Sequence, residues 1–140
     1  MKKYILLSTL ALFISCRKTA EENAIEFQPN KNLIDFKITH GLNEDEVYKL
    51  NDDQLQYLNS EKFNPKTDTI MYKKNELYIS YLTFMTSGPE YRGDFKIKGD
   101  SLLLEIIPFA DYALTEQMAD RIVFKIANNE NKKFKIKKGI

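Results

Sequence analysis

The sequence DFKIKGDSLLLEII, residues 94–107, carries the clearest β-hairpin pattern of the chain. Phe95 and Ile97 alternate with charged residues before the turn, and leucine and isoleucine at every second position restore the apolar face after it. Alternation with a period of two is typical of a strand with one buried face. The Gly-Asp pair between the halves suits a tight hairpin turn. The run of three leucines predicts that the second strand is central in its sheet.

Shorter alternating segments predict further strands at residues 33–38, 68–72, 77–84, 121–127 and 132–138. The turn-like sequences KKNE and NNEN lie between neighbouring segments, so each is predicted to close a hairpin. In the last segment Phe134 and Ile136 face one way, while the intervening lysines face solvent and discourage edge pairing. Together the patterns predict a mainly β fold of about five to seven antiparallel strands. We expect a meander in sequence order that forms a small barrel or a curved sheet.

Residues 42–58 fit two interpretations. As helices, Asn43 with Glu46 and Asn51 with Gln54 form capping boxes, each beside an apolar staple. As strands, VYKL and QLQYL flank a turn of Asn and Asp residues. The alternation within QLQYL slightly favours the strands.

A single helical turn fits a segment later in the chain. Residues 108–118 break the alternation, and Thr115 could cap one helical turn there. This turn would connect the leucine-rich strand to the next predicted strand.

The first fifteen residues differ from all that follows. Lys2 and Lys3 precede an uncharged, largely apolar run from Tyr4 to Ile14. This run has the length of a signal-peptide core, whereas a membrane-spanning helix needs about 20 apolar residues. We therefore expect residues 1–15 to be a secretory signal peptide.

The only cysteine, Cys16, directly follows this run. The stretch Leu12-Phe13-Ile14-Ser15-Cys16 resembles the lipobox of bacterial lipoproteins, although Phe13 stands where Leu is usual and Ile14 where a smaller residue is usual. Such loose lipoboxes are similar to those of Bacteroidetes, and the chain resembles small lipoproteins of these bacteria. In that family the cysteine starts the mature chain, its sulfur carries a diacylglycerol and its amine is acylated. The resemblance implies that Cys16 is lipidated and attaches the protein to a membrane.

The same resemblance implies a location in the cell envelope. In enteric lipoproteins an aspartate after the cysteine retains the protein in the inner membrane, but Arg17 stands here, which favours the outer membrane. Residues 16–32 are polar and are predicted to be the lipidated cysteine and a flexible tether. Residues 33–140 then form a single β-rich domain.

The hairpin sequence GDFKIKGDSLLLEI also resembles hairpins of lipocalin-like lipoproteins, which share its Gly-Asp turn between alternating strands. This resemblance implies a lipocalin-like β-domain. In such a domain the many Tyr and Phe residues could line a cavity for a small apolar ligand.

The sequence offers few groups for chemistry. His40 is the only histidine, and no nucleophile motif or phosphate loop is evident, so we assign no catalytic residue and no cofactor. Zinc sites need several Cys or His ligands, and the acidic residues 44–46 and 52–53 lack the central glycine of a calcium loop. We therefore predict no metal site. Basic and acidic side chains nearly balance, so no nucleic-acid partner is expected.

One loop is a candidate interface. Glu90, Tyr91 and Arg92 lie in the loop of residues 86–93, and Tyr and Arg are enriched among interface hot spots. We expect a lipid-anchored, non-catalytic binding or interaction module whose partner is an envelope protein. The alternative is a carrier of a small apolar ligand, and a hydrolytic enzyme ranks third.

Overall fold

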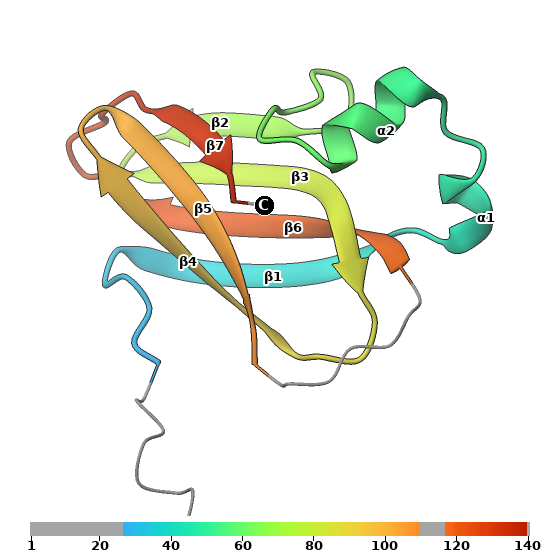
Figure 1. The fold of residues 1–140 in the computed structure, drawn as a ribbon. Coiled ribbons are helices and arrows are strands. Elements are labelled where there is room, and N and C mark those ends of the chain that lie inside the picture. The colour runs from blue at the N-terminus through green and yellow to red at the C-terminus, as the bar shows by residue number, and fades with distance from the viewer. Residues whose placement is uncertain (1–26, 110–116, 140) are drawn as a thin grey trace, which may run out of the picture.

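The computed structural model describes residues 27–109 and 117–139. Two sheets pack against each other, and strands of the second sheet cross the first diagonally (Figure 1). The first sheet holds, in spatial order, β1 (Leu33–Leu42), β6 (Gln117–Ala127), β3 (Glu76–Thr86) and β2 (Thr69–Lys73). The second holds β4 (Tyr91–Lys98), β5 (Ser101–Pro108) and β7 (Lys135–Lys138). The helices α1 (Glu44–Val47) and α2 (Asp52–Leu58) lie at one end (Figure 1).

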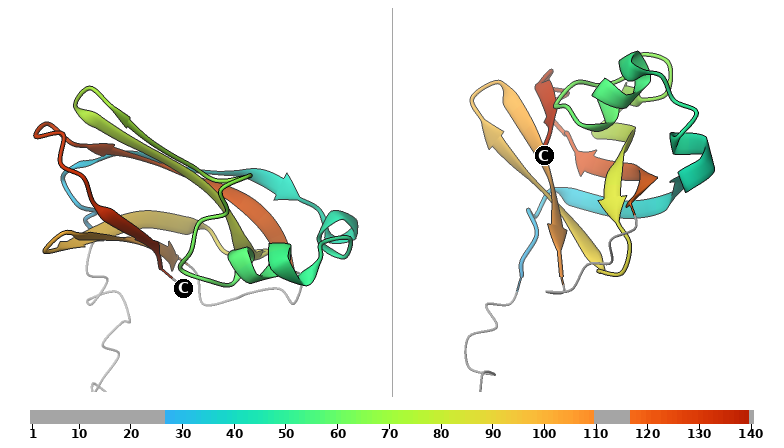
Figure 2. Two further views of the ribbon diagram at one scale, coloured as in Figure 1. Left: turned by 90° about the horizontal axis from the view of Figure 1, so that it is seen from above. Right: turned by 45° about the vertical axis from the view of Figure 1, so that its right-hand side comes forward.

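The prediction of a mainly β fold is confirmed. The predicted hairpins β2–β3 and β4–β5 are both present and antiparallel, and β5 is the central strand of its sheet. Neither sheet closes into a barrel, and the two layers remain distinct when the molecule is turned (Figure 2). The strands follow one another as a meander only within these hairpins, because β6 lies between β1 and β3.

The predicted hairpin of residues 121–127 and 132–138 is wrong. β7 pairs with β5 instead, in parallel, from Ser101 opposite Lys135 to Leu104 opposite Lys138. The reason is that β1 and β3 occupy both edges of β6, which leaves no edge for a returning strand. The chain therefore turns through Asn128, whose side chain bonds both the N–H and the carbonyl of Lys132, and crosses to the second sheet.

Residues 42–58 contain the two short helices α1 and α2, so the favoured strand interpretation is wrong and the capping interpretation is correct. Asn43 accepts from the Glu46 N–H at 3.0 Å, and Asn51 accepts from the Gln54 N–H at 2.9 Å. Each partner side chain bonds back to the cap N–H, which completes both capping boxes. The staple residues then pack around Leu58 and Leu82: Leu42, Val47, Leu50 and Leu55. Capping and this apolar contact together outweigh the short alternation.

The core fills the space between the sheets. Alternating residues of β3 and β6 meet Phe95, Leu102 and Leu104 from the second sheet, and all are essentially inaccessible to solvent. The first sheet contributes Leu77, Ile79, Tyr81, Ile122, Phe124 and Ile126. Half-buried residues such as Phe36 and Ile136 extend this layer toward the edges.

Specific contacts join the sheets at their edges. At one edge the Tyr72 hydroxyl donates to the Phe134 carbonyl at 3.3 Å and accepts from its N–H at 3.0 Å. At the edge formed by β1 and β4, the Phe36 ring lies so close to Gly93 that a Cβ there would overlap it. Glycine at this position therefore allows the two edge strands to approach.

Two predictions from the sequence fall on residues that the structure does not describe. The helical turn with Thr115 and the signal peptide both lie outside the described residues. Among the described helices, none is long and apolar enough to cross a membrane.

Candidate functional site

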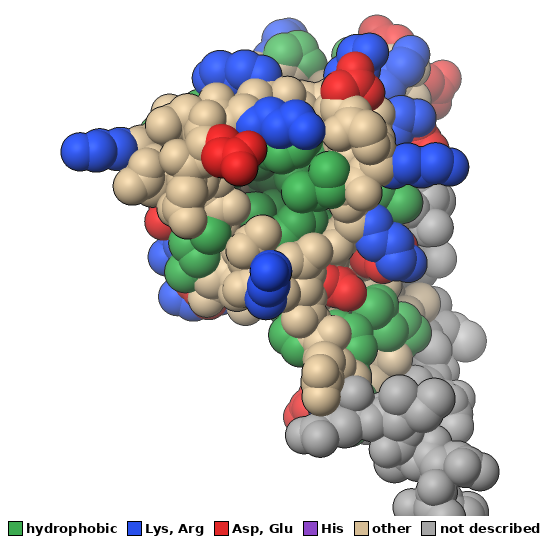
Figure 3. Space-filling model, turned by 90° about the vertical axis from the view of Figure 1, so that its left-hand side faces the viewer, with side chains coloured by type: hydrophobic (Ala, Val, Ile, Leu, Met, Phe, Trp, Pro, Cys, Tyr) green, Lys and Arg blue, Asp and Glu red, His purple; other side chains and the backbone are tan. Residues whose placement is uncertain are grey.

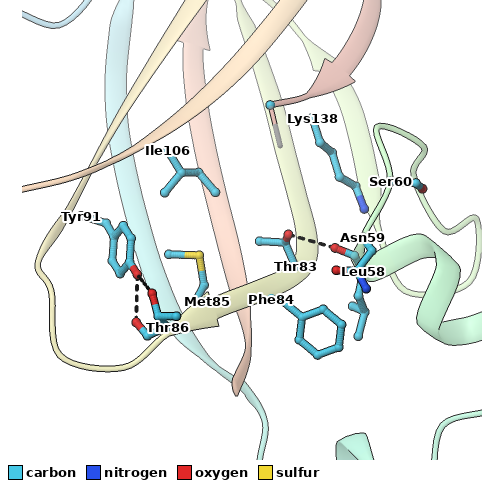
Figure 4. A pocket seen from close by; sticks show the side chains of 11 residues that line it. Leu58, Asn59, Ser60, Thr83, Phe84, Met85, Thr86, Tyr91, Ile106 and Lys138 are labelled. Carbon is cyan, nitrogen blue, oxygen red and sulfur yellow. Dashed lines mark hydrogen bonds between the residues drawn. The ribbon is translucent and has the colours of Figure 1, made fainter. Parts of the chain in front are cut away.

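Two neighbouring clefts border the loop between β3 and β4. The smaller, of about 280 Å³, opens between the sheets and is lined mainly by apolar side chains (Figure 4). The larger, of about 480 Å³, is lined by Phe36, Ile38, the loop residues 86–91, Met118 and Asp120. Thr86 and Tyr91 line both clefts, so they form a shared wall.

The predicted interface residues occupy different surroundings. Tyr91 is half-buried, and its hydroxyl donates to the Thr86 carbonyl at 2.8 Å and lies 2.7 Å from the Thr86 hydroxyl. Glu90 is exposed and lines the larger cleft beside Tyr91. Arg92 instead stacks on Phe109, with its guanidinium 3.6 Å from the ring centre. Glu90, which precedes β4, and Tyr91 both line the larger cleft. Arg92 follows Tyr91 in the strand and therefore points to the opposite face, away from Tyr91.

The smaller cleft combines apolar walls with a few polar groups. Figure 4 shows Tyr91, Met85 and Ile106 on one side and Lys138 with Thr83 on the other. The Thr83 hydroxyl donates to the Leu58 carbonyl at 3.1 Å, which ties the end of α2 to β3. Three of its polar side chains, those of Thr83, Tyr91 and Lys138, are therefore already bonded within the protein.

Lys138 is the functional residue that sequence reasoning missed. The lysine-rich face of residues 132–138 is exposed at Lys133, Lys135 and Lys137 as predicted, but the Lys138 side chain is only 2% exposed. A signal was present, because Lys138 has the same parity as the inward-facing Phe134 and Ile136. Alternation alone placed it on the buried face.

A buried ion pair compensates for this burial. The Lys138 ammonium lies 3.1 Å from the Asp68 carboxylate and donates to the carbonyls of Tyr57 at 2.9 Å and Leu82 at 3.4 Å. Asp68 in turn accepts from the N–H of Leu82 and of Asn64. We call Lys138 and Asp68 the inter-sheet pair, because Asp68 directly precedes β2 whereas Lys138 ends β7.

Burial of the Lys138 ammonium imposes a desolvation cost on its positive charge. Burial lowers the pKa of Lys138 below its ordinary value, and the negative charge of Asp68 opposes that shift. An ammonium has three donors, and all three have acceptors here. Lys138 therefore lines the smaller cleft without offering it a free cation.

Tyr81 lies beside the inter-sheet pair. Its ring centre is 5.1 Å from the Lys138 ammonium, and its hydroxyl is fully buried with no hydrogen-bond partner among the described residues. Burial, with a further contribution from the charge of Asp68, raises the pKa of Tyr81 above its ordinary value. A hydroxyl of this kind costs stability and remains protonated in the folded state.

The other titratable candidates are on the surface. His40 is 61% exposed in β1, and its Nδ1 lies 3.9 Å from the Asp120 carboxylate, which is beyond hydrogen-bond distance. The acidic residues 44–46 and 52–53 belong to the first turns of α1 and α2. In the described part of the chain no three His, Cys, Asp or Glu side chains are grouped as metal ligands. Cys16 lies outside the described residues.

Comparisons with protein-family models, with curated proteins and with solved structures found no match to this chain.

Because both charges of the inter-sheet pair are buried, removing one of them should greatly lower the free energy of unfolding. Lys138→Met leaves Asp68 buried and unpaired, so we expect a loss of about 3–5 kcal/mol in the free energy of unfolding, measured with urea. The double variant Asp68→Asn with Lys138→Met should recover most of this loss, because no buried charge remains. As a control, Lys137→Met removes a half-exposed pair with Glu61 and should cost about 0–1 kcal/mol. Equal effects of the two single variants would refute the proposed role of Lys138.

The raised pKa of Tyr81 predicts that the folded protein loses stability at alkaline pH. Because its pKa is raised in the folded state, the unfolded chain releases the proton first, and stability falls as pH rises above the ordinary value of 10.0. Tyr81→Phe should remove this part of the decline between about pH 9 and about pH 11, as measured by urea unfolding. Near pH 8 it should be neutral or stabilising, by up to about 3 kcal/mol, because it deletes an unpaired hydroxyl. A decline of the same slope in both proteins would contradict this assignment.

Proposed function

We propose that this protein is a lipid-anchored binding module of the cell envelope with no catalytic activity of its own. Cys16 carries the lipid, and the β-domain presents the clefts beside Tyr91 to an envelope protein. The observation that carries this proposal is the shared wall of Thr86 and Tyr91, which separates two clefts at the very loop that the sequence marks as an interface. Concave, mainly apolar surfaces with few polar groups are the usual form of binding sites.

The larger cleft indicates the chemistry of the partner. Phe36, Ile38 and Met118 supply an apolar floor, while Glu90 and Asp120 add two carboxylates. An apolar segment that carries a Lys or Arg residue would complement this surface. Glu90 is exposed and would favour the choice of partner and its approach more than its affinity, whereas the Asp120 side chain is only 14% exposed and would act at close contact.

The groups that line the smaller cleft also support binding rather than chemistry. Lys138 has its donors occupied, and Thr83 and Tyr91 bond to the backbone of their neighbours. Catalysis needs a reactive group positioned to act on a substrate. Within the clefts these side chains act as structural walls.

A carrier of a small apolar ligand is the second candidate. The smaller cleft favours it, because Leu58, Met85 and Ile106 could contact such a ligand. Ligand pockets usually have volumes of about 300–1,000 Å³, and this cleft of about 280 Å³ lies just below that range. The space between the sheets is filled by side chains, so a ligand would have to bind at the open end.

The proposed membrane attachment is tested by Cys16→Ser. Lipidation at Cys16 predicts that the wild-type protein is found in the membrane fraction and incorporates labelled palmitate. The variant should lose both properties, because the serine hydroxyl does not replace the thiol in lipid transfer. Membrane fractionation together with mass spectrometry of the mature N-terminus provides the measurement. If the variant remains in the membrane fraction and is still cleaved after Ser15, the anchor is wrong, because neither a lipid nor a retained signal segment would then explain its location.

The proposed binding surface is tested by site-specific crosslinking in intact cells. A photoreactive amino acid at Glu90 should give a protein adduct, whereas the same residue at Lys74, in the exposed β2–β3 turn, should not. Met118→Lys places a charge in the larger cleft and should reduce the adduct by about tenfold, the effect of losing about 1.4 kcal/mol at a hot spot. Met71→Lys, on the exposed face of β2, is the matched control.

The outcomes separate the candidate functions. A protein adduct that depends on Met118 and not on Met71 supports the binding module. An adduct with the mass of a small apolar molecule favours the carrier instead. Equal adducts at Glu90 and Lys74 would contradict a specific surface at this loop.

A further inference from the structure

An aromatic and cationic cluster with one exposed ring lies on the outer side of β4, on the face opposite to Tyr91. The Arg92 guanidinium lies 3.6 Å from the centre of the Phe109 ring and 5.3 Å from the centre of the Phe27 ring. Phe109 is 58% exposed, which is high for a ring of this size. We call Phe27, Arg92 and Phe109 the Arg92 cluster.

The chain that leads to the proposed lipid starts at this cluster. Phe27 belongs to the cluster, and the next residues are fixed to β4, since the Asn30 N–H donates to Asp94 at 2.8 Å and its side chain to the Phe95 carbonyl at 3.3 Å. Figure 1 shows this first described segment leading away from β1 and β4. The attachment point of the tether on the domain is therefore defined.

The tether is short compared with the domain. Only residues 17–26 separate Cys16 from Phe27. Fully extended, this segment reaches about 36–40 Å, and as a flexible chain its root-mean-square reach is about 17–20 Å. A lipid at Cys16 would consequently hold the Arg92 cluster near the bilayer surface for most of the time.

We infer that the Arg92 cluster is a membrane-contact surface, on which the domain rests against the phospholipid headgroups of its own anchoring membrane. This inference depends on the proposed lipidation of Cys16. Phe109 enters the interfacial layer, where aromatic rings are favourable. Arg92 keeps its charge at the phosphate level while its stem and the two rings cover apolar surface.

The local charges indicate which part of the cluster dominates. Glu90 is an exposed acid next to the cluster, and its carbonyl accepts from the Phe109 N–H at 2.7 Å. Its negative charge offsets that of Arg92 at longer range, so the apolar ring provides the main contact and Arg92 orients it. The surface therefore suits phospholipid headgroups in general and does not require a strongly anionic membrane.

Other apolar areas of the surface do not adjoin a segment that would bring a membrane or another partner to them. The end of the sandwich in Figure 3 shows a hollow with apolar side chains, surrounded by basic and acidic residues. Ile70 and Met71 of β2 are also exposed, on opposite faces of the strand. Nothing at either place indicates an occupant, whereas the Arg92 cluster adjoins the segment that would carry the lipid.

The sequence provides a direct test, because it contains no tryptophan. Phe109→Trp introduces a single fluorescent reporter into the cluster, and Tyr48→Trp introduces one at α1, where the side chain is 79% exposed. Each full-length lipidated variant is reconstituted into vesicles of phosphatidylethanolamine and phosphatidylglycerol with brominated acyl chains. Since interfacial side chains reach about 5–10 Å into the headgroup region, we expect quenching in Phe109→Trp to exceed that in Tyr48→Trp by at least about twofold.

A further variant tests the role of Arg92. Adding Arg92→Gln to Phe109→Trp should lower the quenching, because the ring loses the cation that orients it toward the phosphates. Both reporter positions, 109 and 48, are exposed, so neither tryptophan substitution disturbs the core.

If the protein floats with the vesicles but both reporters are quenched equally, the membrane-contact surface is wrong and the anchor stands. If the wild-type protein fails to float with the vesicles, the anchor is wrong and this inference falls with it.

Discussion

The Lys138 ammonium reaches Asp68 across the space between the two sheets, and the remaining architecture depends on this contact. β7 has four residues and pairs along only one of its edges, so its backbone bonds alone hold it weakly. The inter-sheet pair adds bonds to Asp68, Tyr57 and Leu82 and thereby connects β7 with both α2 and β3. Partner groups surround both charges, which makes the pair specific for one arrangement of the strands.

This contact also shapes the candidate site. Lys138 forms part of the smaller cleft, and the Thr83–Leu58 hydrogen bond positions α2 on the same side. Thr83, Tyr91 and Lys138 bond within the protein, and Leu58, Met85 and Ile106 supply apolar wall beside them. The proposed role as a binding module follows from such walls, and the carboxylates of Glu90 and Asp120 at the neighbouring cleft would give the surface its preference among partners.

The two proposed surfaces arise from neighbouring residues of one strand. Tyr91 turns inward to the clefts, whereas Arg92 turns outward to Phe109 and Phe27. Alternation in β4 thus separates the partner-binding side from the side next to the tether. With the lipid on the tether side, the domain could rest on its membrane while the clefts stay available to an envelope protein.

Local patterns in the sequence were sufficient for the hairpins β2–β3 and β4–β5 and for the central position of β5, because neighbouring residues supply the turn and the alternation. They also indicated both capping boxes, but the alternation within residues 54–58 favoured strands there, and the helices depend in addition on the packing of the staple residues around Leu58 and Leu82. The loop before Tyr91 was also predicted from composition, and its use as an interface stays a prediction. The pairing of β7 with β5 was decided by the occupied edges of β6, and the burial of Lys138 required Asp68, which is distant in sequence. The stacking of Arg92 on Phe109 likewise depended on the register of two strands. Such contacts exist only once the sheets have packed, which is why the tertiary structure alone determined them.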